Sequence, residues 1–440
     1  MNKLDLPYNP ANLKNAQERQ AYARLQQLKT FFESGRASAA PPGGSGGSAA
    51  DKQRWKYQRV LGYGGNGVAA KFRIFEGPDD DHHRDVAVKV QLRDWRSSGL
   101  REEKRIMRPV RPATRKQRKL RKDLTPRELE EKKRRWDYNP NPPPPPPPRG
   151  AGGEVPDSQK DYIVMDYVPN GDLRTLIAKV NEEDTKFPDR VLWSFFMCLV
   201  KQCIGLAYYP RKFHPDRRLD DRDLDERIPP DQQKWRWKNM IHFDYDPLNI
   251  FVDNIDGTPE HLVVPKLKLA DFGLAGEVKS QKRERRLAKW NFYAPEQFGS
   301  EWDFLPAERN GANICNEPVA GNYSIHTNIW CIGQVMFCLM TRRWPLQPPV
   351  AGGFKFPILP GNPDIITYGG TLFNGHWEDI DRDLRMVVSL CLAHNPTDRP
   401  TLEWLHGYIQ GMLATPYRFV GQDDNTIYSW FQNQVLGAPT

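Results

Sequence analysis

The sequence predicts an α+β protein with two lobes: a small antiparallel β lobe with one major helix, and a larger, mainly α-helical lobe. Three observations predict this fold class. Short runs rich in β-branched and aromatic residues, YQRVLG, VAAKFRIF and DVAVKVQL, follow one another after Trp55, as in antiparallel strands. YIVMDYV is a fourth, buried-looking strand. Apolar stretches of helical length, at 189–209 and in IHTNIWCIGQVMFCLM, come only later in the chain.

The chain divides into four parts. Residues 1–34 contain an amphipathic helix, because Leu25, Leu28 and Phe32 recur at spacings of three and four. The other parts are a flexible Gly/Ser/Ala linker at 35–54, a folded domain at 55–415 and a C-terminal tail at 416–440.

Two insertions interrupt the folded domain. The small lobe, about 55–167, contains a basic and polyproline insertion at 108–160, and the large lobe, about 168–415, contains a polar insertion at 210–238. Within the first, TPRE at 125–128 has the form of a capping box and predicts a short helix. The proline run that follows is expected to be extended.

The net charge of +9 is confined to one segment. Between Arg108 and Arg135 there are thirteen Lys or Arg residues and four Asp or Glu residues, an excess equal to that of the whole chain. Without interleaved aromatic residues, such a run favours nonspecific attraction to nucleic-acid phosphates, contact with an import factor, or a solvated spacer. We expect no more specific partner for 108–135.

Nothing in the sequence predicts export or a membrane partner. The N-terminal residues MNKLDLPYNPANLKNAQERQ lack the apolar core of a secretory signal, and no apolar run is expected to reach the ~20 residues that cross a bilayer. The six cysteines form no CxxC pair, so they predict buried free thiols rather than zinc or disulfides. An intracellular location, cytoplasmic or nuclear, is expected.

A glycine-rich sequence separates the first two expected strands. LGYGGNG places Gly62, Gly64 and Gly67 in a GxGxxG pattern, which alone is weak evidence, because glycines in a hairpin turn need only allow a positive φ. The third strand adds Lys89 in VAVKV, and a buried lysine needs an anionic partner. Glu103 of LREEKRIM supplies one carboxylate and nucleotide phosphates a second. The alternative is that the glutamates of this stretch face water.

Five further motifs follow in order along the chain. They are YIVMDYVPNGDL, HFDYDPLN, LADFGLA, APE and NPTDRP. Each of them recurs by chance, but together with the glycine pattern and VAVKV they form seven motifs in one order over more than 300 residues. This order resembles the eukaryotic protein kinases.

The resemblance implies a two-lobed protein-kinase-like fold with ATP and Mg²⁺ as cofactors and a protein as substrate. The implied ATP-binding residues are Leu61, Gly62, Gly64, Gly67, Ala69, Ala87, Lys89, Met165, Asp166, Val168 and Asp172. The implied catalytic residues are Lys89 paired with Glu103, Asp244 as the group that orients the attacking hydroxyl and accepts its proton, and Asn249 and Asp271 as metal ligands. Glu296 of APE is expected to pair with Arg399.

The sequence departs from the kinase pattern at the catalytic loop. Phe243 stands where the family has an Arg that commonly binds a phosphorylated activation loop. The segment from Asp271 to Glu296 contains only Ser280 as a hydroxyl residue before Phe292 and Tyr293. We therefore predict activity that does not depend on loop phosphorylation; an active enzyme silenced by phosphatase treatment would contradict this.

A second departure is a change of charge. Asp246 stands where Ser/Thr kinases usually place a phosphate-contacting Lys, and Lys289 stands at a position usually occupied by Thr. Lys289 is added to the catalytic set on the hypothesis that it neutralises Asp246 or the phosphate. The alternative is that Asp246 turns to solvent and Lys289 is one more charge in a basic loop. Asn328 replaces an Asp that bonds the catalytic-loop backbone, and its amide oxygen accepts the same bonds.

The sequence is compatible with two functions. The first is transfer of the ATP γ-phosphate to a protein hydroxyl, with Pro247 favouring Ser/Thr substrates. The second is a pseudokinase, a nucleotide-binding scaffold, which Phe243 and Asp246 favour. Phosphate transfer is favoured because the chain has all four residues of the implied catalytic chemistry: Lys89, Asp244, Asn249 and Asp271.

Overall fold

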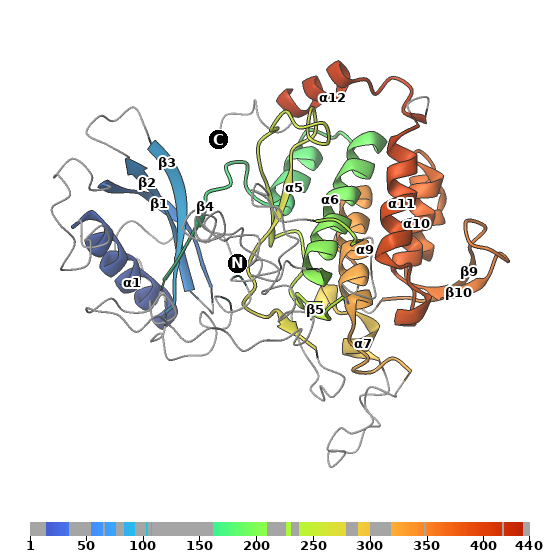
Figure 1. Cartoon of the computed structure of the whole chain (residues 1–440), viewed down its shortest axis with the longest axis horizontal. Coiled ribbons are helices and arrows are strands. Elements are labelled where there is room, and N and C mark those ends of the chain that lie inside the picture. The colour runs from blue at the N-terminus through green and yellow to red at the C-terminus, as the bar shows by residue number, and fades with distance from the viewer. Residues whose placement is uncertain are drawn as a thin grey trace, which may run out of the picture. The chain divides into compact units, whose positions relative to one another are not determined.

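The computed structural model is an α+β protein of two compact units (Figure 1). It describes residues 15–34, 54–64, 67–75, 83–92, 103, 107, 162–208, 226–229, 237–278, 289–299, 318–346, 349–415 and 418–433. Described residues up to Tyr167 form the N-terminal unit, and those from Val168 form the C-terminal unit. The first is β-rich and the second mainly helical, so the expected fold class is confirmed.

Four antiparallel strands form the sheet of the N-terminal unit. They are β1 (Arg54–Gly64), β2 (Gly67–Phe75), β3 (His83–Val90) and β4 (Tyr162–Asp166), in the order β1-β2-β3-β4 (Figure 1). The pairing of β1 shifts register between Tyr57 and Arg59 and again between Val60 and Gly62. Such shifts bend a strand, here just before the glycine-rich turn.

The two faces of this sheet differ, because successive strand residues point to opposite faces. Alternate residues of β2 and β3 are buried against helix α1 (Ala16–Glu33), which lies along the sheet (Figure 1). The strand residues of this cluster include Val68, Ala70, Phe72, Val86, Val88 and Val90. Ala69, Ala87 and Lys89 alternate with them and so lie on the other face. The expected N-terminal helix is confirmed and forms part of the N-terminal core.

Helices predominate in the C-terminal unit (Figure 1). They are α5 (Leu173–Glu182), α6 (Asp189–Ala207), α7 (Pro295–Phe298), α9 (Ile325–Thr341), α10 (Arg382–Cys391), α11 (Leu402–Leu413) and α12 (Asp424–Phe431). The short strands are β5 (Met240–Ile241), β6 (Ile250–Val252), β7 (Leu267–Leu269), β8 (Gly276–Glu277), β9 (Gly352–Lys355) and β10 (Asp364–Thr367). β5 pairs with β8, β6 with β7 and β9 with β10.

Helix α6 corrects one expectation. It has 19 residues and is long and apolar enough to cross a membrane. However, 78% of its most apolar 18-residue stretch is buried inside the structure. It packs against α9 and α11, which explains its apolar composition. Five cysteines lie in the described residues of this unit, and all are free and buried, as predicted: Cys198, Cys203, Cys331, Cys338 and Cys391.

The segment expected to be a C-terminal tail contributes α12. Ile427 and Phe431 of this helix are buried, and the Phe431 ring lies 6.1 Å from that of Phe195 in α6. The basic run 108–135, the capping box at 125–128 and the polyproline run lie outside the described residues, as does most of the polar insertion.

Candidate active site

The catalytic-loop residues lie between β5 and β6. The Asn249 side-chain nitrogen donates to the Asp244 carboxylate at 2.8 Å and to the Asp244 carbonyl oxygen at 2.7 Å. Asn249 is 3% exposed, whereas the Asp244 side chain retains 16% exposure. The amide of Asn249 therefore fixes the carboxylate of Asp244, and its own oxygen becomes the acceptor end of the side chain.

Asp271 lies between two residues that are anchored to this loop. β6 and β7 pair, and Ala270 N donates to Asn249 O at 2.8 Å. Nε2 of His242 lies 3.0 Å from the carbonyl oxygen of Ala270, and its ring lies 5.1 Å from that of Phe272. Asp271 itself has a φ of 58°, an uncommon backbone conformation for a residue with a side chain. The hairpin thus brings Asp271 to the same end of the structure as Asn249.

Phe243 is part of a hydrophobic cluster. It is buried with Ile241, Val278 and Tyr323, and its ring meets that of Tyr323 edge to face at 5.2 Å. An Arg at this position would need a phosphate partner. The aromatic side chain of Phe243 instead packs against Val278, so apolar contacts link the catalytic loop to the activation segment, residues 271–296. This contact supports the prediction that activity is independent of loop phosphorylation, which stays a prediction.

Asp246 and Lys289 form an ion pair. The Asp246 side chain is 1% exposed and binds the Lys289 ammonium, which also lies 3.8 Å from Asp244. Burial raises the pKa of the Asp246 carboxyl to about 6, and the charge of Lys289 opposes this rise. The alternative that Asp246 turns to solvent is therefore wrong. Lys289 brings a positive charge to the catalytic loop from the activation segment.

The expected pair of Glu296 and Arg399 is also present. Two nitrogens of the guanidinium donate to the two carboxylate oxygens, each at 2.8 Å, and both side chains are 0% exposed. Thr327 donates to Glu296 at 2.9 Å, and Arg399 donates further to backbone carbonyls, including that of Ala393. This network ties α7 to α9 and the loop before α11.

Asn328 of α9 supports the backbone of the catalytic loop. Its oxygen accepts from His242 N at 3.1 Å, as expected, and its nitrogen also donates to the Met240 carbonyl oxygen at 2.8 Å. A carboxylate at this position lacks the second bond, because it has no donor when ionised. Asn328 therefore makes a donor bond that an ionised Asp at this position cannot make.

Substitution Asn328→Asp is expected to lower the free energy of unfolding by about 1–3 kcal/mol, because it places a carboxylate oxygen against a buried carbonyl oxygen. Urea unfolding measures the effect. Asn254→Asp is the control, since exposed Asn254 accepts one hydrogen bond through its side-chain oxygen and an aspartate preserves this acceptor. Equal stability of Asn328→Asp and wild type would contradict the assignment.

In the N-terminal unit, Lys89 and Glu103 form a buried ion pair. The Lys89 ammonium lies 3.1 and 2.9 Å from the two carboxylate oxygens, with exposures of 3% and 2% for the two side chains. The expected pairing of Lys89 with Glu103 is confirmed, and the alternative of a solvated carboxylate is wrong for this residue. Two opposite charges at this distance orient each other in a low-dielectric setting.

Four of the expected ATP-binding residues of the sheet, Gly62, Ala69, Ala87 and Met165, share the face that carries Lys89. In the strand register Ala69 is opposite both Gly62 and Lys89, and Ala87 is opposite Met165. Leu61 lies between Val60 and Gly62, where the register shifts, and Gly64 pairs with Gly67 at the turn. Asp166 ends β4, and Val168 is the second residue after it.

Two of these expected positions have structural roles that the sequence did not show. A Cβ atom on Gly67 would lie 2.5 Å from the Val90 carbonyl oxygen, so this glycine permits the close approach of β2 and β3. Asp172 is buried, and its carboxylate caps α5 by accepting from the backbone and hydroxyl of Thr175 at 2.8 and 2.7 Å. ATP binding by either residue stays a prediction.

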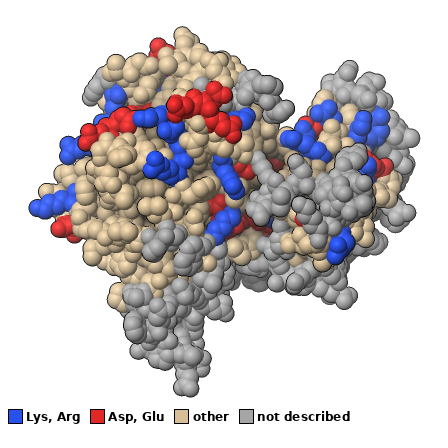
Figure 2. Space-filling model, turned by 180° about the vertical axis from the view of Figure 1, so that it is seen from behind, with Lys and Arg blue, Asp and Glu red and all other residues tan. Residues whose placement is uncertain are grey.

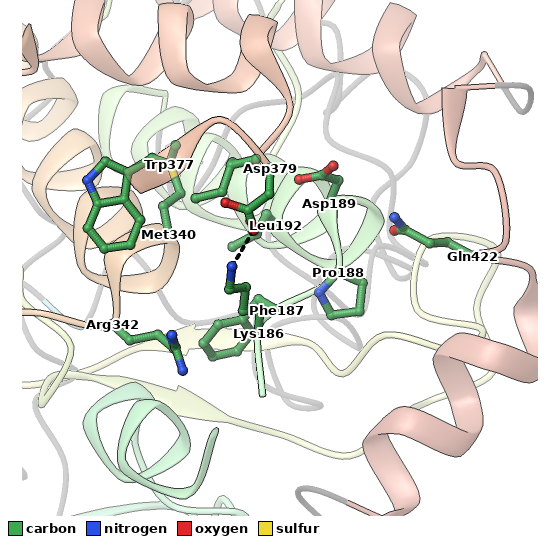
Figure 3. A pocket seen from close by; sticks show the side chains of 11 residues that line it. Lys186, Phe187, Pro188, Asp189, Leu192, Met340, Arg342, Trp377, Asp379 and Gln422 are labelled. Atoms are coloured by element: carbon green, nitrogen blue, oxygen red, sulfur yellow. Dashed lines mark hydrogen bonds and ion pairs between the residues drawn. The ribbon is translucent and has the colours of Figure 1, made fainter. Parts of the chain in front are cut away.

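A cavity of about 200 Å³ lies elsewhere in the C-terminal unit. Its lining includes Lys186, Asp189, Met340, Arg342, Trp377 and Asp379 (Figure 3). None of the expected catalytic residues lines it. Lys186 and Asp379 form an ion pair at its edge, with 2.6 Å between nitrogen and oxygen. Burial raises the pKa of the Asp189 carboxyl to about 6.

This raised pKa predicts a pH effect on stability. Because the folded protein holds the Asp189 proton more tightly than the unfolded chain, the contribution of this group is fully present below about pH 4 and is lost as pH rises to about 6. Asp189→Asn cannot ionise, so its stability relative to wild type should increase by about 1 kcal/mol between pH 4 and 7, after allowance for partial exposure. Thermal unfolding across this range measures it. Exposed Asp364→Asn is the control, and parallel pH curves for Asp189→Asn and wild type would contradict the prediction.

Charged side chains of both signs lie on the face of the molecule that Figure 2 shows. On the face shown in Figure 2, basic and acidic residues lie close together rather than in one large patch of a single sign. Contact of 108–135 with nucleic acid or an import factor stays a prediction, because that run lies outside the described residues.

Several residues at the site were not found by sequence reasoning. Tyr323 covers Phe243, and Ala270 joins the two halves of the β6–β7 hairpin end. Tyr323 belongs to no motif and comes from a distant part of the chain, whereas Ala270 lies within LADFGLA but acts through its backbone. The only sequence signal for an apolar neighbour such as Tyr323 was Phe243 at the position of the family's Arg, because a buried aromatic side chain needs apolar contacts.

Comparisons with known proteins agree with this geometry. Residues 237–417 match the protein kinase domain family. The chain is 24% identical over 201 residues to the dual specificity protein kinase TTK of Mus musculus, covering 42% of this chain and 20% of that protein. It is 22% identical to the probable serine/threonine-protein kinase nek2 of Dictyostelium discoideum, covering 57% and 45%. It is 26% identical to the serine/threonine-protein kinase CHK1 of Saccharomyces cerevisiae, covering 42% and 34%.

The chain spans 20% to 45% of the length of these relatives. The family match lies in the C-terminal unit, where Asn249 holds the Asp244 carboxylate and the β6–β7 hairpin places Ala270, the residue before Asp271, against the Asn249 backbone. The N-terminal unit adds an antiparallel sheet with a buried Lys89–Glu103 pair. The match at residues 237–417 and the kinase relatives support a divergent eukaryotic protein kinase, and the geometry of each unit agrees with this family.

Proposed function

We propose that the protein is an active kinase that transfers the γ-phosphate of ATP to Ser or Thr hydroxyls of a protein. The observation that carries this proposal is the arrangement around Asp244. Its carboxylate is held by Asn249 at 2.8 Å and lies 3.8 Å from the ammonium of Lys289. This places a proton acceptor, an amide oxygen and a cation together, as phosphoryl transfer requires.

Asp244 orients the hydroxyl of the substrate and accepts its proton. Its partial exposure of 16% leaves it accessible to a substrate, while Asn249 fixes its direction. Lys289, 33% exposed, supplies positive charge near the acceptor. In the N-terminal unit, the Lys89 ammonium is held in place by Glu103 and would bind the α and β phosphates.

The donor set suits Mg²⁺. Hard oxygen ligands are what this ion prefers, and the hydrogen bonds from the Asn249 amide nitrogen leave its oxygen as the ligand atom. Asp271, at the end of the same hairpin, supplies a carboxylate. When bound, the ion neutralises charge on the phosphates.

The Ser/Thr preference is supported by Pro247 and by the names of two relatives, which are serine/threonine-protein kinases. The competing function is a nucleotide-binding pseudokinase. It is favoured by the pairing of Lys289 with Asp246, because that contact occupies the cation that would otherwise face the phosphate.

A phosphotransfer assay separates the two functions. Purified protein with Mg·ATP and a generic protein substrate is compared with an Asp271→Ala blank, and ATP binding is measured in parallel. Transfer to Ser or Thr by wild type alone supports the proposal. ATP binding without transfer above the blank would show a pseudokinase instead.

A further inference from the structure

Helix α1 covers the face of the N-terminal sheet opposite to Lys89. Ala21, Leu25, Leu28 and Phe32 of α1 are buried against the strands. The Phe32 ring lies 4.4 Å from that of Trp55 and 5.2 Å from that of Phe72. The C-terminal end of the helix is thus fixed to the sheet by aromatic packing.

The N-terminal end of α1 contacts the glycine-rich hairpin. Tyr63 lies between Gly62 and Gly64 and pairs with Val68 in the strand register, so it belongs to the α1 face. Its hydroxyl donates to the Glu18 carboxylate at 3.1 Å. Both side chains are 7% exposed.

Glu18 is itself positioned by the start of the helix. Asn15 caps α1 by accepting from Glu18 N at 2.8 Å, and the Asn15 amide nitrogen donates to the Glu18 carboxylate at 3.2 Å. Burial raises the pKa of the Tyr63 hydroxyl, as do the hydrogen bond and charge of Glu18. Tyr63 therefore remains a protonated donor at neutral pH.

The same helix holds the end of β3. Gln20 donates to the Leu92 carbonyl oxygen at 2.9 Å, and Arg24 donates to it at 3.4 Å. Leu92 follows the strand that carries Lys89. α1 thus contacts two of the elements expected to bind nucleotide, and it does so from the face that the nucleotide does not use.

We propose that α1 positions the glycine-rich hairpin for nucleotide binding through the Glu18–Tyr63 hydrogen bond. Gly62 and Gly64 on the two sides of Tyr63 permit several backbone conformations, and this bond selects one of them at the end of β1. Gly62 and its partner Ala69 lie on the Lys89 face of the sheet, so the conformation selected at Tyr63 also sets their positions. Glu18 and Tyr63 are positioning residues, and the inference rests on the proposed function only in that the nucleotide is ATP.

The test measures nucleotide affinity in the full chain. Tyr63→Phe removes one hydroxyl and Glu18→Ala removes the acceptor. Each should raise the Kd of Mg·ATP about tenfold, because the competent hairpin conformation becomes a minor population. The double variant should bind no more weakly than either single variant, and Glu18→Gln, which retains an acceptor oxygen, should restore most of the affinity. Glu33→Ala, at the other end of α1, is the control.

Hydrogen exchange of the amides in 61–68 provides a second readout that needs no ligand and should be faster in Tyr63→Phe. In steady-state kinetics KM for ATP should rise while kcat stays unchanged. Unchanged Kd in both single variants, additive losses in the double variant, or an equal loss in Glu33→Ala would overturn the inference. If the wild-type chain binds ATP but transfers no phosphate, the proposed function is wrong and the inference about α1 is unaffected. If it binds no ATP, both the proposed function and the inference about α1 are wrong.

Discussion

Replacing Lys289 with alanine is expected to lower the rate of phosphate transfer about 100-fold, the loss typical of removing one preorganised charge or donor from an active site. Lys289 contacts buried Asp246 and lies 3.8 Å from Asp244. Without it, two carboxylates of the catalytic loop face each other with no cation between them, and both repel the phosphate. Initial rates at saturating ATP measure the effect, with Lys282→Ala, another lysine of the activation segment, as the control.

A double variant separates the two roles that Lys289 can have. If the lysine acts only by neutralising Asp246, then Asp246→Asn combined with Lys289→Ala should recover most of the lost rate. If it also binds the phosphate, the double variant stays slow. A loss in Lys289→Ala no greater than that in Lys282→Ala would contradict any catalytic role.

Removing either partner of the Glu296–Arg399 pair is expected to have the largest effect on stability. Both side chains are 0% exposed and are joined by two hydrogen bonds of 2.8 Å. Arg399→Ala leaves a buried carboxylate without its counter-ion, so the free energy of unfolding should fall by about 3–5 kcal/mol. Urea unfolding of the C-terminal unit within the full chain measures this loss.

The exposed ion pair of Lys186 and Asp379 is the matched control, with side-chain exposures of 59% and 46%. Asp379→Ala should cost no more than about 1 kcal/mol, since solvent screens the pair. Glu296→Ala should resemble Arg399→Ala, because each leaves one buried charge unpaired. Equal losses in Asp379→Ala and Arg399→Ala would contradict the assigned importance of the buried pair.

Much of the fold and site could be predicted because the residues concerned are specified by short-range patterns. The strand runs and the helix with Leu25, Leu28 and Phe32 follow from periodicity. A buried Lys89 needs an anionic partner, and the resemblance to protein kinases selected Glu103 for that role. The pairing of Lys289 with Asp246 was one of two alternatives raised by the opposite charges of these departures, and the structure shows this one.

Other features depend on contacts that no local pattern determines. The amphipathic pattern of α1 did not show which surface it covers, and nothing in the sequence joined Glu18 to Tyr63. The donor bond from Asn328 to Met240 follows from a close approach of α9 to β5. Likewise, α6 has the composition of a membrane-spanning helix because its neighbours bury it on several sides.

The most direct test of the account is incorporation of labelled γ-phosphate into the protein itself or an added peptide by wild type and Asp244→Ala. Asp244→Ala removes the proposed proton acceptor while leaving Lys89 and its partner Glu103 unchanged. We expect both proteins to bind ATP, wild type to incorporate phosphate, and the variant to do so at a rate at least 100-fold lower, within the range for loss of a general base. Equal incorporation by both proteins, or none by wild type under conditions where it binds ATP, would contradict this expectation.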